Sequence, residues 1–146
     1  MWTKCHSIVT GEVTKEQMWK LWSDVNRWAT WDKSVEFARL EGKFEAGNVY
    51  DFQPKGGPKL KMKIHHTVEN QEFTDLTTFP LAKMYGKHTF EETPEGLKVT
   101  TTMTVVGILG FLWRKLVAQK IVDDLPVDMI EQIKAAKKII IKNEIY

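Results

Sequence analysis

The sequence predicts an α+β domain in which a curved antiparallel sheet of about seven strands wraps around a long C-terminal helix. Two patterns predict this arrangement. Between residues 35 and 106, apolar and polar residues alternate in short runs separated by turn residues, as half-buried strands require. From about residue 110, apolar residues recur at the spacing of one helix face. The chain has 146 residues, the usual size of one domain, so residues 1–146 are expected to form a single domain.

The composition is that of a folded protein without a strong net charge. Hydrophobic residues make up 42% and charged residues 27% of the chain, close to globular averages. Lysine and arginine number 21 against 19 acidic residues, so nucleic acid is not an expected partner. The single cysteine, Cys5, cannot form an intramolecular disulfide, and no segment approaches the roughly 18 apolar residues of a spanning helix. We therefore expect a cytoplasmic protein without stable membrane insertion.

The first part of the chain predicts one strand followed by two short helices. β-Branched residues are frequent in residues 2–10, which favours a strand. Thr14 is followed three residues later by Gln17, the spacing of a capping box, at the start of an amphipathic helix. A second short helical turn is expected at residues 25–28.

The central part predicts a meander of antiparallel strands, because turn residues recur there at short intervals. The clearest alternation places Leu60, Met62, Ile64 and His66 on one face and lysines on the other, which indicates one dry and one wet side. The expected strands lie at residues 35–41, 48–54, 60–68, 72–79, 84–92 and 97–106.

The C-terminal part predicts one long helix. Apolar residues lie at helical spacing from Gly110 to about Lys142. Pro126 removes a backbone hydrogen bond inside this stretch, so a kink or a break is expected there. A helix of this length can span a sheet.

Two segments are similar to a known family. Residues 18–32 contain an Asp-Val pair at Asp24, then Trp28, then a Trp-Asp pair at Trp31, and residues 40–47 have the spacing Leu-x-Gly-x-Phe-x-x-Gly. Together with the order of the elements, they resemble the helix-grip fold of the START-like superfamily, which includes polyketide cyclases, lipid-transfer domains and pollen-allergen-like binders. The resemblance covers essentially the whole chain. It implies a cavity between sheet and helix and does not name the occupant.

His66 and His88 have the clearest chemical potential. If each strand alternates as expected, both imidazoles face the interior, where they can orient a polar ligand group or act as acid or base near neutral pH. The alternative is that each is a hydrogen-bonded core or rim histidine. Two histidines provide too few ligands for a catalytic zinc site, so no metal is expected.

Residues 107–113 join the last strand to the helix and combine glycines with bulky apolar residues. Three roles are open for this segment: a lid, a buried join between two elements, or a membrane-surface contact helped by Arg114 and Lys115 beside Trp113. The sequence has no nucleophile motif and no glycine-rich phosphate loop, so no catalytic residue is assigned and no cofactor is expected.

We expect the chain to bind a small hydrophobic or amphipathic molecule, such as a lipid, a polyketide-like or an aromatic compound. The six tryptophans and seven phenylalanines fit an apolar wall, or else a bulky core. The alternatives are a cyclase, dehydratase or hydrolase that uses a cavity histidine, and a protein-interaction module of the chaperone-activator type. A monomer and a homodimer are both open. The predicted lining consists of Met62, Ile64, His66, His88, Phe90, Thr101, Met103, Trp113, Val117 and Ile121.

Overall fold

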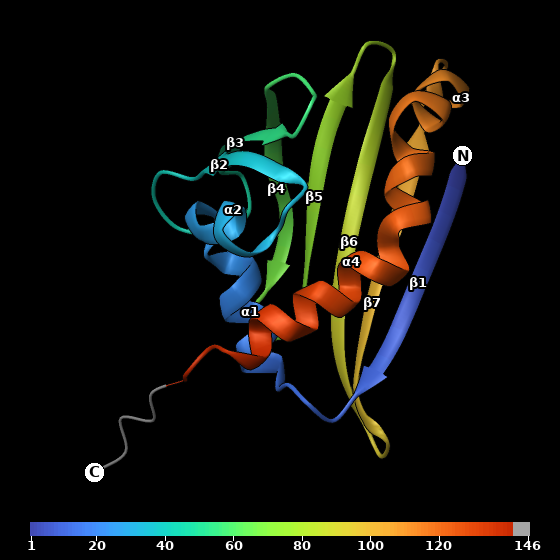
Figure 1. Cartoon of the computed structure of the whole chain (residues 1–146). Helices are drawn as coiled ribbons and strands as arrows, with labels where there is room; N and C mark the ends of the chain where they lie inside the picture. The colour runs from blue at the N-terminus through green and yellow to red at the C-terminus, as the bar shows by residue number, and fades with distance from the viewer. Residues whose placement is uncertain (142–146) are drawn as a thin grey trace.

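A single curved sheet of seven antiparallel strands forms the body of the protein in the computed structural model, which describes residues 1–141 (Figure 1). Neighbouring strands follow one another along the chain, except that β1 lies beside β7, so the order is β1-β7-β6-β5-β4-β3-β2. The predicted α+β class is confirmed. The strands are β1 (Trp2–Thr10), β2 (Val35–Arg39), β3 (Val49–Pro54), β4 (Leu60–Val68), β5 (Glu72–Phe79), β6 (Ala82–Thr93) and β7 (Gly96–Val106).

Helical segments occur at two points of the chain. Short ones follow β1, and a long composite one follows β7 and lies across one face of the sheet (Figure 1). Every helix in residues 1–141 is too short or too polar to cross a membrane. The segments are α1 (Lys15–Ser23), the 3₁₀ turn η1 (Val25–Arg27), α2 (Trp28–Trp31), α3 (Gly110–Trp113), the π-helical η2 (Arg114–Ala118) and α4 (Gln119–Lys137).

α1 begins at the predicted capping box. The backbone N–H of Gln17 donates to Thr14 Oγ1 at 3.1 Å, and the backbone N–H of Thr14 donates to Gln17 Oε1 at 2.9 Å. The same glutamine side chain donates through Nε2 to the carbonyl oxygen of Ile139 at 3.0 Å. The cap therefore also ties the start of α1 to the chain that follows α4.

The C-terminal helix is continuous but not uniform. Pro126 lies inside α4, and the helix bends near the middle of α4 without breaking (Figure 1). A kink is expected there because proline lacks the N–H that an α-helix needs. The π-helical turn η2 was not predicted. α4 ends at Lys137, residues 139–141 are not helical, and the predicted end at Lys142 lies outside the described residues.

The interior is divided into two apolar cores. The larger core combines α1, α2 and the C-terminal part of α4 with the sheet, and contains Met18, Trp22, Trp28, Tyr50 and Met129. The smaller core joins the ends of β5, β6 and β7 to η2. Its buried members are Phe79, Ala82, Met84, Met103, Val105 and Ala118.

We expect the substitution Thr14→Ala to lower the free energy of unfolding by about 1 kcal/mol, because it leaves the backbone N–H of Gln17 without its acceptor. Urea unfolding followed by circular dichroism measures the loss. Thr14→Ser keeps the hydroxyl and should retain most of the stability. Equal losses in the two variants would contradict a role for the cap.

Candidate ligand site between the sheet and the helices

The inner face of the sheet carries most of the predicted lining residues. Met62 is half-buried on β4, and the half-buried residues of the C-terminal helix pack against the smaller core; these are Trp113, Val117 and Ile121. The buried residues come from three strands, β4, β6 and β7: Ile64, His88, Phe90, Thr101 and Met103. All ten predicted residues except His66 are thus buried or half-buried, and their role as the lining of a ligand site stays a prediction.

The prediction that His66 faces the interior is wrong. β4 pairs with β5 through Ile64 and Asp75, but His66 pairs with Thr74, so the register shifts by one residue at a β-bulge. The extra residue, His65, reverses the alternation that the sequence suggested. As a result the side chain of His66 is 54% exposed, and its Nε2 lies 3.2 Å from an oxygen of Glu72.

The prediction of a cavity between the sheet and the helix also needs correction, because side chains fill this space in residues 1–141. The predicted residues fall into two cores, with Ile64 and Phe90 in the larger and Met103 in the smaller. Two hollows at the surface of residues 1–141 have volumes of about 330 and 240 Å³, and none of the ten predicted residues lines either of them. Aromatic and aliphatic side chains fill the space beneath α1, where Trp22 and Phe73 are in ring contact.

A polar cluster lies within this packed interior. His88 Nδ1 lies 3.2 Å from Thr101 Oγ1, and His88 Nε2 lies 3.8 Å from an oxygen of Asp75. The imidazole packs against two aromatic rings that also contact each other, with centroid distances of 4.4 Å to Phe73 and 4.6 Å to Trp22. The side chains of His88 and Asp75 are 11% and 12% exposed. These contacts fix the orientation of the ring.

Asp75 is the central residue that the sequence reasoning missed. It pairs with Gly86 across β5 and β6, and a Cβ atom added at Gly86 would lie 2.8 Å from Asp75 Oδ1. The glycine therefore makes the room that the carboxylate occupies. The alternation of residues 72–79, in which Asp75 shares a face with Phe73, was a signal that could have placed it inside.

Four buried side-chain polar atoms have no hydrogen-bond partner among residues 1–141, and one of them belongs to Trp22, whose ring contacts His88. They are Trp22 Nε1, Tyr50 Oη, Thr77 Oγ1 and Gln132 Oε1. Burial, and then the negative charge of Asp75, raise the pKa of the Tyr50 phenol well above its usual value, so the hydroxyl stays protonated. Because nearly all buried polar groups in proteins are hydrogen-bonded, such a group of unpartnered atoms needs an explanation.

The arrangement offers side chains that can orient a polar group. The 3.8 Å between His88 and Asp75 is longer than a hydrogen bond. Within residues 1–141, no group of three or more histidine, cysteine, aspartate or glutamate side chains is placed to hold a metal ion. The hydrogen-bonding groups of His88, Asp75 and Thr101 instead lie among aromatic rings.

Comparison with solved structures shows which known fold this architecture shares. A START superfamily protein from Mycobacterium smegmatis matches with a TM-score of 0.67 at 12% identity, covering 90% of this chain and 97% of that chain. Ara h 8.0201 matches with a TM-score of 0.66 at 16% identity, covering 93% and 95%. The di-domain ARO/CYC StfQ from the steffimycin biosynthetic pathway matches over 49% of its length and 92% of this chain, at 0.67 and 14% identity. The chain has the START-like fold.

Comparisons at the level of sequence give nothing further: no family model and no curated protein matches the chain. At identities of 12 to 16%, the solved structures establish the START-like fold alone, and function has to be argued from the site.

Acidic side chains meet where α2 and α4 approach each other in this START-like fold. Burial raises the pKa of Asp128 on α4 from its ordinary range to about 6, with further contributions from the charges of Asp32 and Asp124, and the charge of Lys120 opposes the shift. Asp32 is the C-terminal cap of α2. The ionised form of Asp128 is therefore disfavoured at the place where the helices close over the sheet.

The stability of the protein should depend on pH through Asp128. Its folded-state pKa is raised to about 6, so the folded state binds the proton more tightly than the unfolded state, and the free energy of unfolding falls as pH rises from about 4 to about 6. Asp128→Asn should add up to about 1 kcal/mol at pH 7.5, a figure reduced for solvent screening, and almost nothing near pH 4. Urea unfolding at both pH values measures this.

The matched control for this experiment is Asp123→Asn, an exposed aspartate on the same helix. It should not give a pH-dependent gain. A gain in Asp128→Asn of the same size at pH 4 and pH 7.5 would contradict the role assigned to its ionisation.

Proposed function

We propose that the protein binds a small amphipathic molecule at the inner face of the sheet. The polar group of the ligand lies at the polar cluster of His88, Asp75 and Thr101, where Tyr50 and Trp22 add two further side chains. The observation that carries this proposal is that Trp22 Nε1 and Tyr50 Oη are buried without partners among residues 1–141, on rings that pack against other rings of the interior. An unpartnered buried group costs about 1–3 kcal/mol. A ligand that supplies the missing partners would recover that cost as binding free energy.

The chemistry of the cluster favours a ligand with an uncharged polar group. Tyr50 and Trp22 provide hydrogen-bond donors, and Asp75 provides an acceptor. A hydroxyl or carbonyl group suits such a set. A carboxylate would meet the charge of Asp75 in an environment that screens it poorly. The apolar part of the ligand would lie against the aromatic rings and contribute about 25 cal/mol for each Å² that it buries.

In this proposal the ligand enters when α4 separates from the sheet. Such a movement is needed because packed side chains close the interior. A surface hollow of about 240 Å³ already parts β1 from α4, between Ile8 and Ile130. Of its strand residues, Ile8 pairs with Val99, and Val99 pairs with Phe90, which is two residues from His88 on β6. Separation is supported by two irregular points in the helix, η2 and Pro126.

Tyr50→Phe should raise the free energy of unfolding of the ligand-free protein by about 1 kcal/mol, because it removes a buried hydroxyl that has no partner in residues 1–141. Thermal and urea unfolding measure this change. The control is Tyr85→Phe, because Tyr85 lies on β6 and points to the outer face of the sheet. It should leave stability within about 0.5 kcal/mol. A destabilised Tyr50→Phe would show that its hydroxyl is satisfied in the folded protein.

The ligand class is tested by titrating the purified protein with a primary alcohol and with the carboxylate of the same chain length, at pH 8, following tryptophan fluorescence. We expect the alcohol to bind roughly tenfold more tightly or better. Asp75→Asn should reduce that preference, while Asp51→Asn, at an exposed aspartate paired with Lys61, should not. Absence of binding for both compounds, or a preference for the carboxylate, would refute the proposal.

A further inference from the structure

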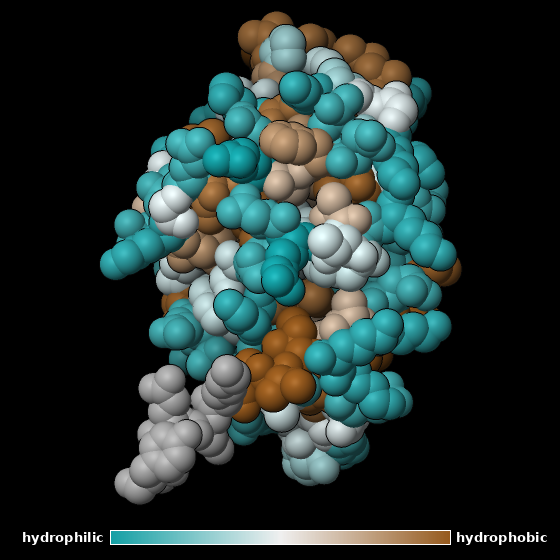
Figure 2. Space-filling model, turned by 60° about the vertical axis from the view of Figure 1, so that its left-hand side comes forward, coloured by the Kyte–Doolittle hydropathy of each residue, from teal (hydrophilic) through white to brown (hydrophobic). Residues whose placement is uncertain are grey.

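One end of the molecule exposes a group of large apolar side chains. The β5–β6 turn and the segment that leads from β7 into the C-terminal helix meet there, and hydrophobic side chains gather at this end of the molecule in Figure 2. We call this end the tip. Its apolar side chains are between 37% and 80% exposed, and they are Leu81, Ile108, Phe111, Leu112 and Leu116. Single exposed apolar residues are common, but a group of them indicates a partner.

The tip is a built structure and not a loose loop. The indole of Trp113 stacks on Phe79 with a centroid distance of 4.4 Å, and its Nε1 donates to the carbonyl oxygen of Pro80 at 3.0 Å. The backbone N–H of Leu109 donates to the carbonyl oxygen of Leu81 at 3.0 Å. The two segments therefore hold each other, and their apolar side chains project from a fixed base.

Leu81 lies in a backbone conformation that disfavours leucine. Its φ is 57°, in the left-handed region that side chains with a Cβ rarely adopt. The turn between β4 and β5 has Asn70 at a φ of 62°, the kind of residue that tolerates this region. An exposed leucine at the turn thus costs backbone strain without adding to a core, which points to a role outside folding.

The charge around the tip has one sign. Residues 76–90 and 96–122, which include both tip segments, contain no aspartate or glutamate. Lys83, Arg114 and Lys115 lie in these stretches, and none of them forms an ion pair with a described residue. The apolar side chains are therefore accompanied by cations whose charges are not compensated by neighbouring carboxylates.

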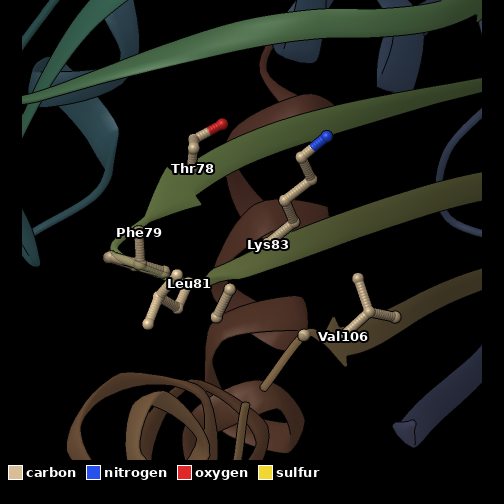
Figure 3. A pocket seen from close by; sticks show the side chains of 7 residues that line it. Thr78, Phe79, Leu81, Lys83 and Val106 are labelled. Atoms are coloured by element: carbon tan, nitrogen blue, oxygen red, sulfur yellow. The ribbon is translucent and has the colours of Figure 1, made fainter. Parts of the chain in front are cut away.

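A shallow hollow of about 330 Å³ adjoins these groups (Figure 3). Its wall is mostly apolar, with Phe79, Leu81 and Val106, and Figure 3 shows the side chains of Thr78 and Lys83 extending on the same side of the sheet. The hollow thus combines an apolar surface with one amine. A phosphate group could pair with the amine while an acyl chain lies against the apolar wall.

We propose that the tip binds the surface of a membrane that contains anionic lipids. Apolar side chains at one end of the molecule can enter the boundary between headgroups and acyl chains, and the neighbouring lysines and arginine are attracted to lipid phosphates. A second copy of the chain fits less well, because a symmetric contact would bring Lys83, Arg114 and Lys115 of both copies together. This surface is separate from the interior cluster and does not depend on a ligand there.

The test is flotation of the full chain with phosphatidylcholine vesicles that contain 30% phosphatidylserine, and with vesicles of phosphatidylcholine alone, at about 50 mM and 500 mM salt. We expect binding to the anionic vesicles at low salt and at least about tenfold weaker binding at high salt or without phosphatidylserine. Equal binding to both vesicles, or no binding to either, would overturn the proposal. Sedimentation of the protein without vesicles, run in parallel, measures whether the chain forms dimers.

Two substitutions separate the contributions of the tip. Leu81→Gly removes the apolar side chain and also relieves the backbone strain, so it should weaken vesicle binding several-fold while leaving the melting temperature unchanged or higher. Val127→Ser is the matched control, because Val127 is 65% exposed on α4, close to the 64% of Leu81. It should bind vesicles like the unaltered chain.

Charge reversal completes the set. Lys83→Glu combined with Lys115→Glu should weaken binding to anionic vesicles at least about tenfold, and Lys43→Glu, an exposed lysine outside the tip segments, should have little effect. Concentration-dependent dimers that Leu81→Gly abolishes, without vesicle binding, would identify a second copy as the partner and overturn the proposal. So would vesicle binding that none of the tip variants changes.

Discussion

The pairing register between β5 and β6 is the constraint on which the interior depends. It places Asp75 opposite Gly86, and Phe73 opposite His88. Because side chains alternate across a sheet, a slip of β5 by one residue against β6 would turn Phe73 and Asp75 toward solvent and bring Thr74 to the inner face, away from the imidazole of His88. The glycine is part of the same constraint, since the carboxylate occupies the space that a Cβ would fill. The register thus brings a polar cluster into an otherwise apolar core.

This cluster explains why the interior is two cores and not one. The apolar residues beneath α1 end at Ile64, Phe73 and Phe90, and those beneath η2 begin at Met84 and Met103. Between them lie buried polar side chains of the inner face, among them His88 and Thr101. A continuous apolar core would bury the same area without unpartnered groups. The division therefore costs stability, which is the usual position of a site that has a use other than folding.

The strands, the capping box and the bend near Pro126 could be predicted because each follows from local patterns: alternation, a threonine and a glutamine three residues apart, and a missing N–H. The orientation of His88 followed from alternation in the same way. His66 could not be placed correctly, because the bulge at His65 depends on pairing with β5 and leaves no local signal. Asp75 was missed for a different reason: an aspartate is rarely buried, so its alternation with Phe73 carried little weight.

The sequence could not predict that side chains of residues 1–141 fill the space beneath α1, because the patterns indicate which face is dry and not how completely side chains fill it. The aromatic residues that suggested a wall also suffice to close the space: Trp22 contacts Trp28, Phe73 and His88. The resemblance of residues 18–32 to a segment of the START-like superfamily indicated the fold correctly. Packing density is instead set by tertiary contacts, which such a motif does not encode.

One helical run connects the interior with the tip. α3 is fixed to the β5–β6 turn through Trp113, and α4 covers the inner face, with the π-helical η2 between them. A π-helical turn replaces the regular hydrogen-bond ladder, and such turns are frequent at functional places in helices. The irregular turn therefore lies between the anchored α3 and the α4 that separates from the sheet in the proposed route of entry. In that proposal α4 moves while α3 keeps its position, so the proposed surface contact of the tip and the proposed opening of the interior are compatible in the same fold.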